Sequence, residues 1–244
     1  MSTCYCFPLI LFFSLISGCA NSFQYHWQHP EKPEGEYVIL VHGLRANSSY
    51  MLDLQKALVD SGYHVLNVDY PSSKYRIQIL ADTAIGGALK LCTSFCDTVH
   101  LIGHSMGNAL IRYYLQKPHP CTVKRIVMVA PVNQGSELVN RLNWIPLFAK
   151  LNGPAGMQLG CGENRFLATL PPLPAETGII AGSRTINPVA SLIIPGKDDG
   201  RVSIENTKIK GMDDFIIVPG NHHVITQKDS TVRSALRFIR KGHF

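Results

Sequence analysis

The pentapeptide GHSMG, residues 103–107, constrains the fold of this chain more than any other feature. It follows an apolar run at 98–102 and precedes residues 106–116, whose apolar side chains recur at the i, i+3, i+4, i+7 and i+8 spacing of a helix. A serine between two glycines at a strand-to-helix junction is typical of a sharp turn that lifts the hydroxyl clear of a sheet. The pattern predicts that Ser105 is an activated nucleophile; the alternative is a glycine-rich turn without chemistry.

The rest of the chain alternates short apolar runs with helical periodicity. Strands are predicted at 37–41, 64–68, 98–102, 125–130, 178–181, 191–194 and 215–218, and helices at 49–60, 76–91, 106–116 and 226–240. This order predicts an α/β fold with a mostly parallel central sheet and helices on both faces. No internal repeat or second domain is predicted.

The regular alternation stops between residues 131 and 176, a stretch with no strand of that type and six prolines. We expect a small insertion or cap over the carboxyl edge of the sheet. Its apolar part, residues 142–173, would either form the wall of an acyl pocket or pack as ordinary core.

From residue 37 to the C-terminus the chain resembles an α/β-hydrolase of the serine esterase and lipase type. The resemblance rests on GHSMG and on Val41-His42-Gly43-Leu44, directly after the first predicted strand. It implies that nucleophile, acid and base follow in that order, with no cofactor. It also implies an oxyanion hole formed by the backbone N–H groups of Leu44 and Met106. We interpret His42 as structural and His104 as a packing and orienting residue.

The same resemblance predicts the acid and the base. Asp199 precedes Gly200 in an Asp-Gly-x-Val context after the run at 191–194, with Asp198 as the alternative. His222 follows the run at 215–218 and precedes the last helix, with His223 as the alternative. In such a triad the imidazole takes the serine proton, and the carboxylate fixes the imidazole tautomer and stabilises its charged form.

These residues predict a carboxylic-ester hydrolase that acts on an acyl-ester or lipid substrate through an acyl-serine intermediate. An acyltransferase or thioesterase on the same fold is the first alternative. A hydrolase-fold binding protein that has lost activity is the second. Nothing in the sequence specifies an oligomeric state.

The first residues have a different character. Residues 1–18 carry no charge, and their apolar core is too short to span a bilayer. They end in Ile16-Ser17-Gly18-Cys19, which resembles the lipobox of bacterial lipoproteins, although no Lys or Arg precedes the apolar core. The resemblance predicts a signal peptide at 1–18, a lipidated Cys19 with a polar tether at 19–35, and a hydrolase domain at 36–244. It implies a membrane partner through the lipid anchor, at the outer membrane facing the periplasm, because Ala20 is not an aspartate.

Of the seven cysteines, four remain outside the leader and the lipid site: Cys92, Cys96, Cys121 and Cys161. They would form disulfides or remain buried thiols, and the sequence leaves both open. No C-x-x-C pair or histidine cluster supports a metal site. The net charge of +6 is spread over the chain without a dense basic stripe, which argues against a nucleic-acid partner.

Overall fold

A computed structural model describes residues 20–32, 35–162 and 165–244. The predicted signal peptide and the predicted lipid site, Cys19, lie outside the described residues. No helix among those described is long and apolar enough to cross a bilayer.

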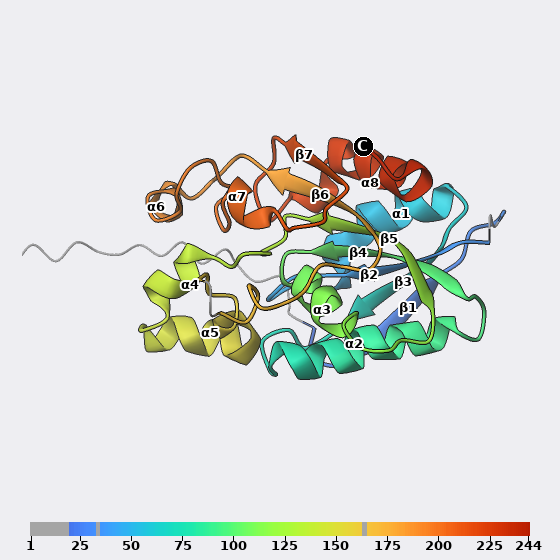
Figure 1. Cartoon of the computed structure of the whole chain (residues 1–244), viewed down its shortest axis with the longest axis horizontal. Coiled ribbons are helices and arrows are strands. Elements are labelled where there is room, and N and C mark those ends of the chain that lie inside the picture. The colour runs from blue at the N-terminus through green and yellow to red at the C-terminus, as the bar shows by residue number, and fades with distance from the viewer. Residues whose placement is uncertain (1–19, 33–34, 163–164) are drawn as a thin grey trace, which may run out of the picture.

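Seven strands form one sheet in the order β1-β3-β2-β4-β5-β6-β7 (Figure 1). The strands are β1 (Gln24–Gln28), β2 (Tyr37–Val41), β3 (His64–Asp69), β4 (Thr98–His104), β5 (Thr122–Val129), β6 (Glu176–Gly182) and β7 (Asp214–Val218). Only β1 is antiparallel to its neighbour; the other pairs are parallel. The predicted fold class is therefore confirmed.

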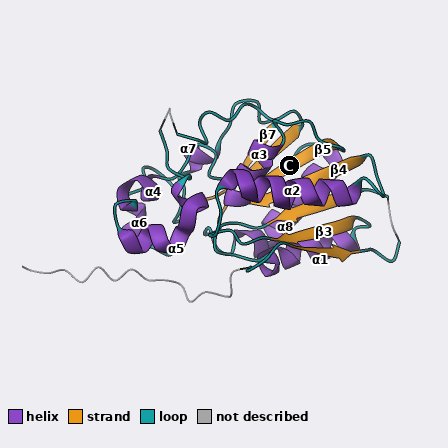
Figure 2. Cartoon of the chain, turned by 90° about the horizontal axis from the view of Figure 1, so that it is seen from below, coloured by secondary structure: helices purple, strands orange, loops and turns teal. Residues whose placement is uncertain are grey.

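Helices cover both faces of this sheet (Figure 2). The longer ones are α1 (Leu52–Asp60), α2 (Ile77–Cys92), α3 (Met106–Tyr114) and α8 (Asp229–Lys241). The helices α2 and α3 pack on one face, and α1 and α8 pack on the other, so alternate strand residues are buried on each side. Two short 3-10 helices, η1 (Ser48–Met51) and η2 (Ile225–Gln227), precede α1 and α8.

The predicted insertion between β5 and β6 holds two helices, α4 (Glu137–Leu142) and α5 (Pro146–Met157). They lie beyond the carboxyl ends of the strands, on the left of Figure 1. Gly153 kinks α5 at a φ of 65°, and a Cβ there would lie against the backbone of Ser73. The cap is thus held against the loop after β3.

Two predictions about the elements are wrong. The apolar run at 191–194 forms no strand, because Asn187 caps the short helix α6 (Pro188–Ser191) by accepting from Ala190 N, and Leu192 is 88% exposed. The place beside β6 in the sheet is taken by β7.

The predicted tether also contains a strand, β1, which pairs with β3 from Gln24 opposite Asp69 to Gln28 opposite Val65. Its Trp27 packs edge-on against Tyr37 and Phe95. The folded domain therefore begins before residue 36. Another short helix, α7 (Ile204–Thr207), was not foreseen from the sequence.

Candidate active site

The turn between β4 and α3 places Ser105 at the carboxyl edge of the sheet. Its backbone has φ 52° and ψ −121°, a conformation that non-glycine residues rarely adopt. Gly107 is required because a Cβ there would lie 2.4 Å from the carbonyl oxygen of Val41. Gly103 faces α3, where a Cβ would lie 2.2 Å from Asn108 Oδ1. The predicted strand–turn–helix geometry is present.

The structure brings together the three predicted catalytic residues. Ser105 Oγ lies 2.8 Å from His222 Nε2, and His222 Nδ1 lies 2.7 Å from Asp199 Oδ2. All three are buried, with 7% of Ser105, 6% of His222 and 2% of Asp199 exposed. A neutral imidazole that donates from Nδ1 to the carboxylate presents Nε2 as an acceptor for the serine proton.

The turn after Asp199 fixes that carboxylate. Asp199 Oδ1 accepts hydrogen bonds from the backbone N–H groups of Arg201 and Val202, both at 3.0 Å. The Asp-Gly-x-Val context therefore has a physical meaning, since the two residues after the glycine supply donors. This donor role of Arg201 and Val202 was not predicted from the sequence.

The alternative residues occupy other positions. Asp198 Oδ1 accepts from Ser191 Oγ at 2.9 Å and from Gly200 N at 2.7 Å, which stabilises the loop. In the part of the chain that the structure describes, no hydrogen bond joins the His223 ring to Ser105. Burial lowers the pKa of His223 to about 4, and the neighbouring His222 and Arg201 act in the same direction. The geometry favours Asp199 and His222.

The turn after β2 lies directly against the serine. A Cβ at Gly43 would be 3.0 Å from Ser105 Cβ and 3.1 Å from His104 Nδ1. Leu44 follows at this turn, and Met106 is the first residue of α3, whose N-terminal N–H groups lack intrahelical acceptors. Of the two predicted oxyanion residues, Met106 thus adjoins Ser105 in the chain, and Leu44 follows the glycine that lies against it.

The two remaining histidines near the site have packing roles. His42 is fully buried, stacks on Tyr70 with ring centroids 4.1 Å apart, and donates from Nδ1 to Gly43 O. Burial lowers its pKa to about 4, so it is neutral near pH 7. His104 Nε2 donates to the carbonyl of His222 at 2.9 Å, which fixes the backbone of the predicted base.

Two arginines near the site were not singled out from the sequence. Burial lowers the pKa of Arg201, and the positive charge of Arg45 acts in the same direction. Arg45 follows Leu44 and has a φ of 56°. The only sequence signal was their place next to the motifs, in His-Gly-Leu-Arg and Asp-Gly-Arg-Val.

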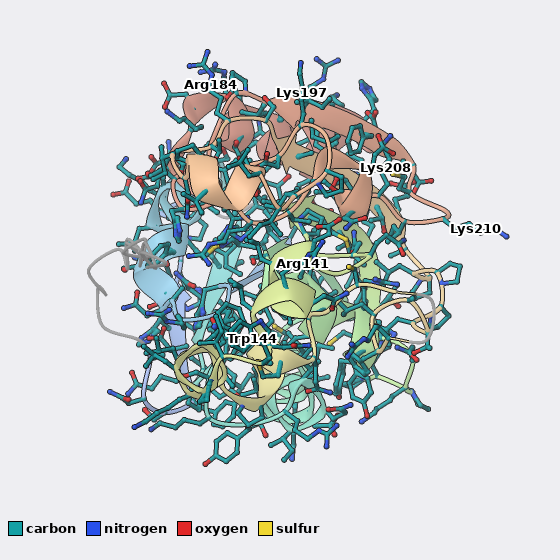
Figure 3. The ribbon with its side chains drawn as sticks, turned by 90° about the vertical axis from the view of Figure 1, so that its left-hand side faces the viewer. Arg141, Trp144, Arg184, Lys197, Lys208 and Lys210 are labelled. Carbon is teal, nitrogen blue, oxygen red and sulfur yellow. The ribbon has the colours of Figure 1, made fainter. Side chains whose placement is uncertain are left out.

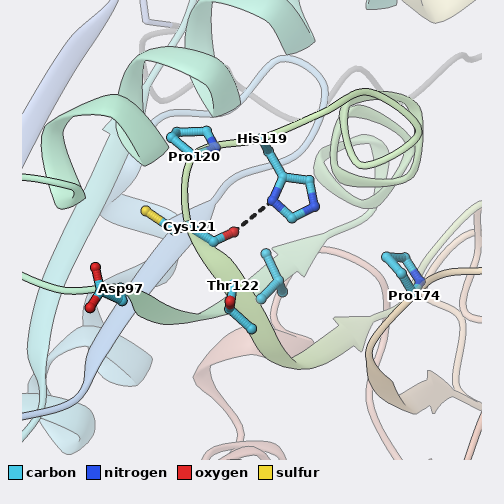
Figure 4. A pocket seen from close by; sticks show the side chains of 7 residues that line it. Asp97, His119, Pro120, Cys121, Thr122 and Pro174 are labelled. Atoms are coloured by element: carbon cyan, nitrogen blue, oxygen red, sulfur yellow. Dashed lines mark hydrogen bonds between the residues drawn. The ribbon is translucent and has the colours of Figure 1, made fainter.

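Other candidate sites lie elsewhere or are absent from the described chain. A pocket of about 330 Å³ at the amino end of β5 is lined by Asp97, His119, Cys121 and Pro174 among others (Figure 4). It lies at the opposite edge of the sheet from Ser105. Within residues 20–32, 35–162 and 165–244, no group of three His, Cys, Asp or Glu side chains could hold a metal ion.

The four cysteines outside the leader are free thiols. Burial raises the pKa of Cys92 to about 12 and that of Cys96 to about 11, so both are protonated near pH 7. The sequence left disulfides and free thiols open for these four cysteines, and the structure contains the free thiols.

A serine, a histidine and an aspartate hydrogen-bonded in series at the carboxyl edge of a mostly parallel sheet define the class of hydrolases with a nucleophile elbow. The sequence profile of the Alpha/beta hydrolase family matches residues 38–227, and the chain belongs to that family.

A sequence relative has a name that refers to esterases and lipases. "Putative esterase/lipase 3" of Mycoplasma pneumoniae is 29% identical over 117 residues, which is 47% of this chain and 43% of that protein. The alignment thus spans less than half of the Mycoplasma protein.

Solved structures share the fold. The mature Bacillus licheniformis lipase BlEst2 superposes with a TM-score of 0.70 at 17% identity, covering 91% of this chain and 98% of the lipase. An esterase from Exiguobacterium antarcticum gives a TM-score of 0.62 at 14% identity, covering 92% of this chain and 100% of the esterase. Both likenesses concern the fold, which is the α/β-hydrolase fold.

Proposed function

We propose that this protein is a carboxylic-ester hydrolase that acts through an acyl-serine intermediate, with Ser105 as nucleophile, His222 as base and Asp199 as acid. The observation that carries the proposal is the hydrogen-bonded series from Ser105 Oγ to His222 Nε2 and from His222 Nδ1 to Asp199 Oδ2, at 2.8 and 2.7 Å. The family membership and the esterase and lipase relatives support the same reaction class.

In the first half of the reaction, Ser105 Oγ attacks the ester carbonyl carbon while its proton passes to His222 Nε2. Negative charge develops on the carbonyl oxygen, and the N–H groups of Leu44 and Met106 stabilise it. The carbon–oxygen bond to the leaving alcohol then breaks, and His222 returns the proton to that oxygen. The product is the free alcohol and an acyl ester on Ser105.

In the second half, water replaces the alcohol. His222 takes a proton from the water, which attacks the acyl carbonyl, and the same oxyanion hole stabilises the charge. The proton then passes to Ser105 Oγ, and the carboxylic acid leaves. Asp199 keeps the imidazole in the tautomer that both halves need, because its other oxygen is held by two backbone N–H groups.

A fluorophosphonate probe combined with a chain-length series of p-nitrophenyl esters tests the proposal. We expect a single covalent adduct on Ser105, located by peptide mass, and ester turnover that disappears in Ser105→Ala. A protein that neither reacts with the probe nor hydrolyses any ester would be a binding protein on a hydrolase fold. If added alcohols or thioesters are strongly preferred over water and oxygen esters, the chain is an acyltransferase or a thioesterase.

The cellular location is a second part of the proposal. The apolar leader at 1–18 and the lipobox-like Ile16-Ser17-Gly18-Cys19 support export, acylation of Cys19 and attachment to the outer membrane facing the periplasm. Acylation by a single chain gives only marginal membrane binding, so stable attachment needs the several chains of a mature lipoprotein. Labelling cells with a radioactive fatty acid, with Cys19→Ser as the control, tests this part directly.

A further inference from the structure

Exposed apolar side chains lie on the cap and on the segment around α6, which packs against α4. Three of them are the most exposed large hydrophobic residues of the described chain: Leu192 at 88%, Trp144 at 76% and Ile186 at 73%. Val189 at 59% and Leu147 at 54% are also exposed. We call these five residues the cap patch. Exposed apolar side chains that cluster, rather than occur singly, are typical of an interaction surface.

The two segments that carry the cap patch contain cations and no acidic residue, and the acidic Glu205 nearby is paired with Lys208. Residues 138–162 and 177–197 contain no Asp or Glu, while Arg141, Lys150, Arg184 and Lys197 are exposed cations in these two segments. Figure 3 shows Arg141 and Trp144 on one face of the molecule, with Arg184, Lys197, Lys208 and Lys210 on the same side. The surface is therefore both apolar and cationic.

This face lies at the carboxyl edge of the sheet. The helices α4, α5 and α6 are beyond the ends of the parallel strands, on the side where Ser105 follows β4 (Figure 1). The start of the described chain reaches the same edge, because Ala20 N donates to Ala46 O at 3.2 Å, two residues after Leu44. Lys74 Nζ donates to Asn21 O at 3.0 Å, which fixes the next residue.

We propose that the cap patch docks the protein onto the surface of an anionic phospholipid bilayer. Aliphatic side chains and a tryptophan enter the boundary between headgroups and acyl chains, and lysine and arginine side chains pair with anionic headgroups. Trp144 suits this position, since its indole N–H is already bonded to Arg141 O at 2.9 Å and its ring is free to enter the lipid.

The charge pattern favours a bilayer over a second copy of the chain. In a symmetric dimer the same patch would face itself, so the cations of residues 138–162 and 177–197 would meet the same cations of the other subunit, and these segments offer no acidic residue to pair with them. An anionic bilayer instead supplies the opposite charge over the whole area. Docking would turn the carboxyl edge of the sheet, which carries Ser105, toward the lipid. This docking depends neither on Cys19 acylation nor on ester hydrolysis.

Trp144 fluorescence tests the proposal in the full-length chain. Trp27 is the other tryptophan, so Trp27→Phe leaves Trp144 as the sole tryptophan, which excitation at long wavelength selects over the tyrosines. With phosphatidylglycerol vesicles we expect a blue shift and strong quenching by brominated acyl chains, and much weaker changes with phosphatidylcholine. Because the readout is local, attachment through the leader alone leaves it unchanged. Trp144 emission that does not change on vesicles, or that changes equally on both lipids, would overturn the proposal.

Matched variants locate the surface. The double variant Ile186→Ser, Leu192→Ser should weaken the phosphatidylglycerol-dependent shift at least tenfold in apparent affinity. Ile79 lies on α2 and is 51% exposed, and Ile79→Ser should leave the phosphatidylglycerol-dependent shift unchanged. Thermal unfolding should be the same for all three proteins, since every substituted side chain is exposed. A double variant that binds as tightly as the parent contradicts the proposal, as does one that converts a stable dimer into a monomer.

Discussion

His222 is joined to Asp199 twice. Its side-chain Nδ1 lies 2.7 Å from Asp199 Oδ2, and its backbone N–H donates to the carbonyl of Asp199 at 2.9 Å. The loops after β6 and β7 are therefore fixed to each other by the main chain before any chemistry is considered. Close approach of these loops also requires Gly182, where a Cβ would lie 2.8 Å from Asp199 Cβ.

The first prediction separates each catalytic residue from its neighbour. Asp199→Asn and His222→Ala should each lower turnover by about 10⁴-fold, because each removes a member of the triad. Asp198→Asn should cost less than about tenfold, since asparagine still accepts from Ser191 Oγ and Gly200 N. His223→Ala should cost equally little, because its ring is not bonded to Ser105.

Steady-state hydrolysis of a soluble ester by the four variants decides the assignment. If Asp198→Asn or His223→Ala loses more turnover than the paired variant, the hydrogen bonds in this structure are not those of the reacting enzyme.

The second prediction distinguishes chemistry from turn geometry. Ser105→Ala should abolish hydrolysis and change the free energy of unfolding by less than about 0.5 kcal/mol, because it removes only a hydroxyl. Gly107→Val should lose both activity and stability, by about 3 kcal/mol, since its Cβ would meet the Val41 carbonyl at 2.4 Å. Ester hydrolysis and thermal unfolding measured on both proteins test this. If the Ser105→Ala protein still hydrolyses esters, Ser105 has no catalytic role and only forms part of the turn.

The third prediction concerns the leader. Cys19→Ser should release the protein from membranes or block its processing, whereas Cys4→Ser, inside the predicted signal peptide, should be processed normally. The measurement is the mass and the membrane fraction of each protein from cells. Identical mass and fractionation for Cys19→Ser and the parent would contradict acylation at this residue.

The fourth prediction uses a histidine far from the candidate site. His100 on β4 is fully buried, and neither ring nitrogen has a hydrogen-bond partner in the described structure. Burial lowers its pKa from 6.5 to about 4, although Glu36 at 3.6 Å acts in the opposite direction. Between these values the unfolded chain binds a proton that the folded chain excludes, so the stability contribution is present above pH 6.5 and is lost as the pH falls toward 4.

We therefore expect His100→Leu to flatten the fall in stability between pH 7 and pH 4.5, by up to about 3 kcal/mol. Urea unfolding at several pH values measures it, with the exposed His243→Leu as the matched control. The same steep fall in both variants would show that His100 does not contribute.

Much of this architecture was accessible from the sequence, because buried parallel strands are continuous apolar runs and their covering helices are amphipathic. The runs at 37–41 and 98–102 and the junction at Ser105 appear where they were predicted. Asp199 and His222 were predicted from their loop contexts, and the structure places them within hydrogen-bond distance of each other.

Elsewhere local composition did not determine the structure. Residues 191–194 are apolar enough for a strand, but a strand also needs a free sheet edge, and β7 occupies the one beside β6. Residues 24–28 alternate exposed with half-buried side chains at the outer edge of the sheet, so their polar composition concealed a strand. Sequence ranked Asp199 above Asp198 only through the family resemblance, because the physical difference lies in the backbone donors of the following turn.

The hydrogen bonds that hold Asp199 itself come from residues outside 184–197, although Ser191 in that segment bonds to the neighbouring Asp198. The Asp199 carboxylate is fixed by Arg201 and Val202, its carbonyl by His222, and Asp198 pairs with Ser203 across the same turn. Residues 184–197, with α6 and three of the five cap-patch side chains, form an excursion between β6 and this turn. Natural variation or laboratory evolution could therefore lengthen, shorten or exchange that excursion while the acid stays in register, so the outer surface of such an enzyme can diverge much faster than its reaction.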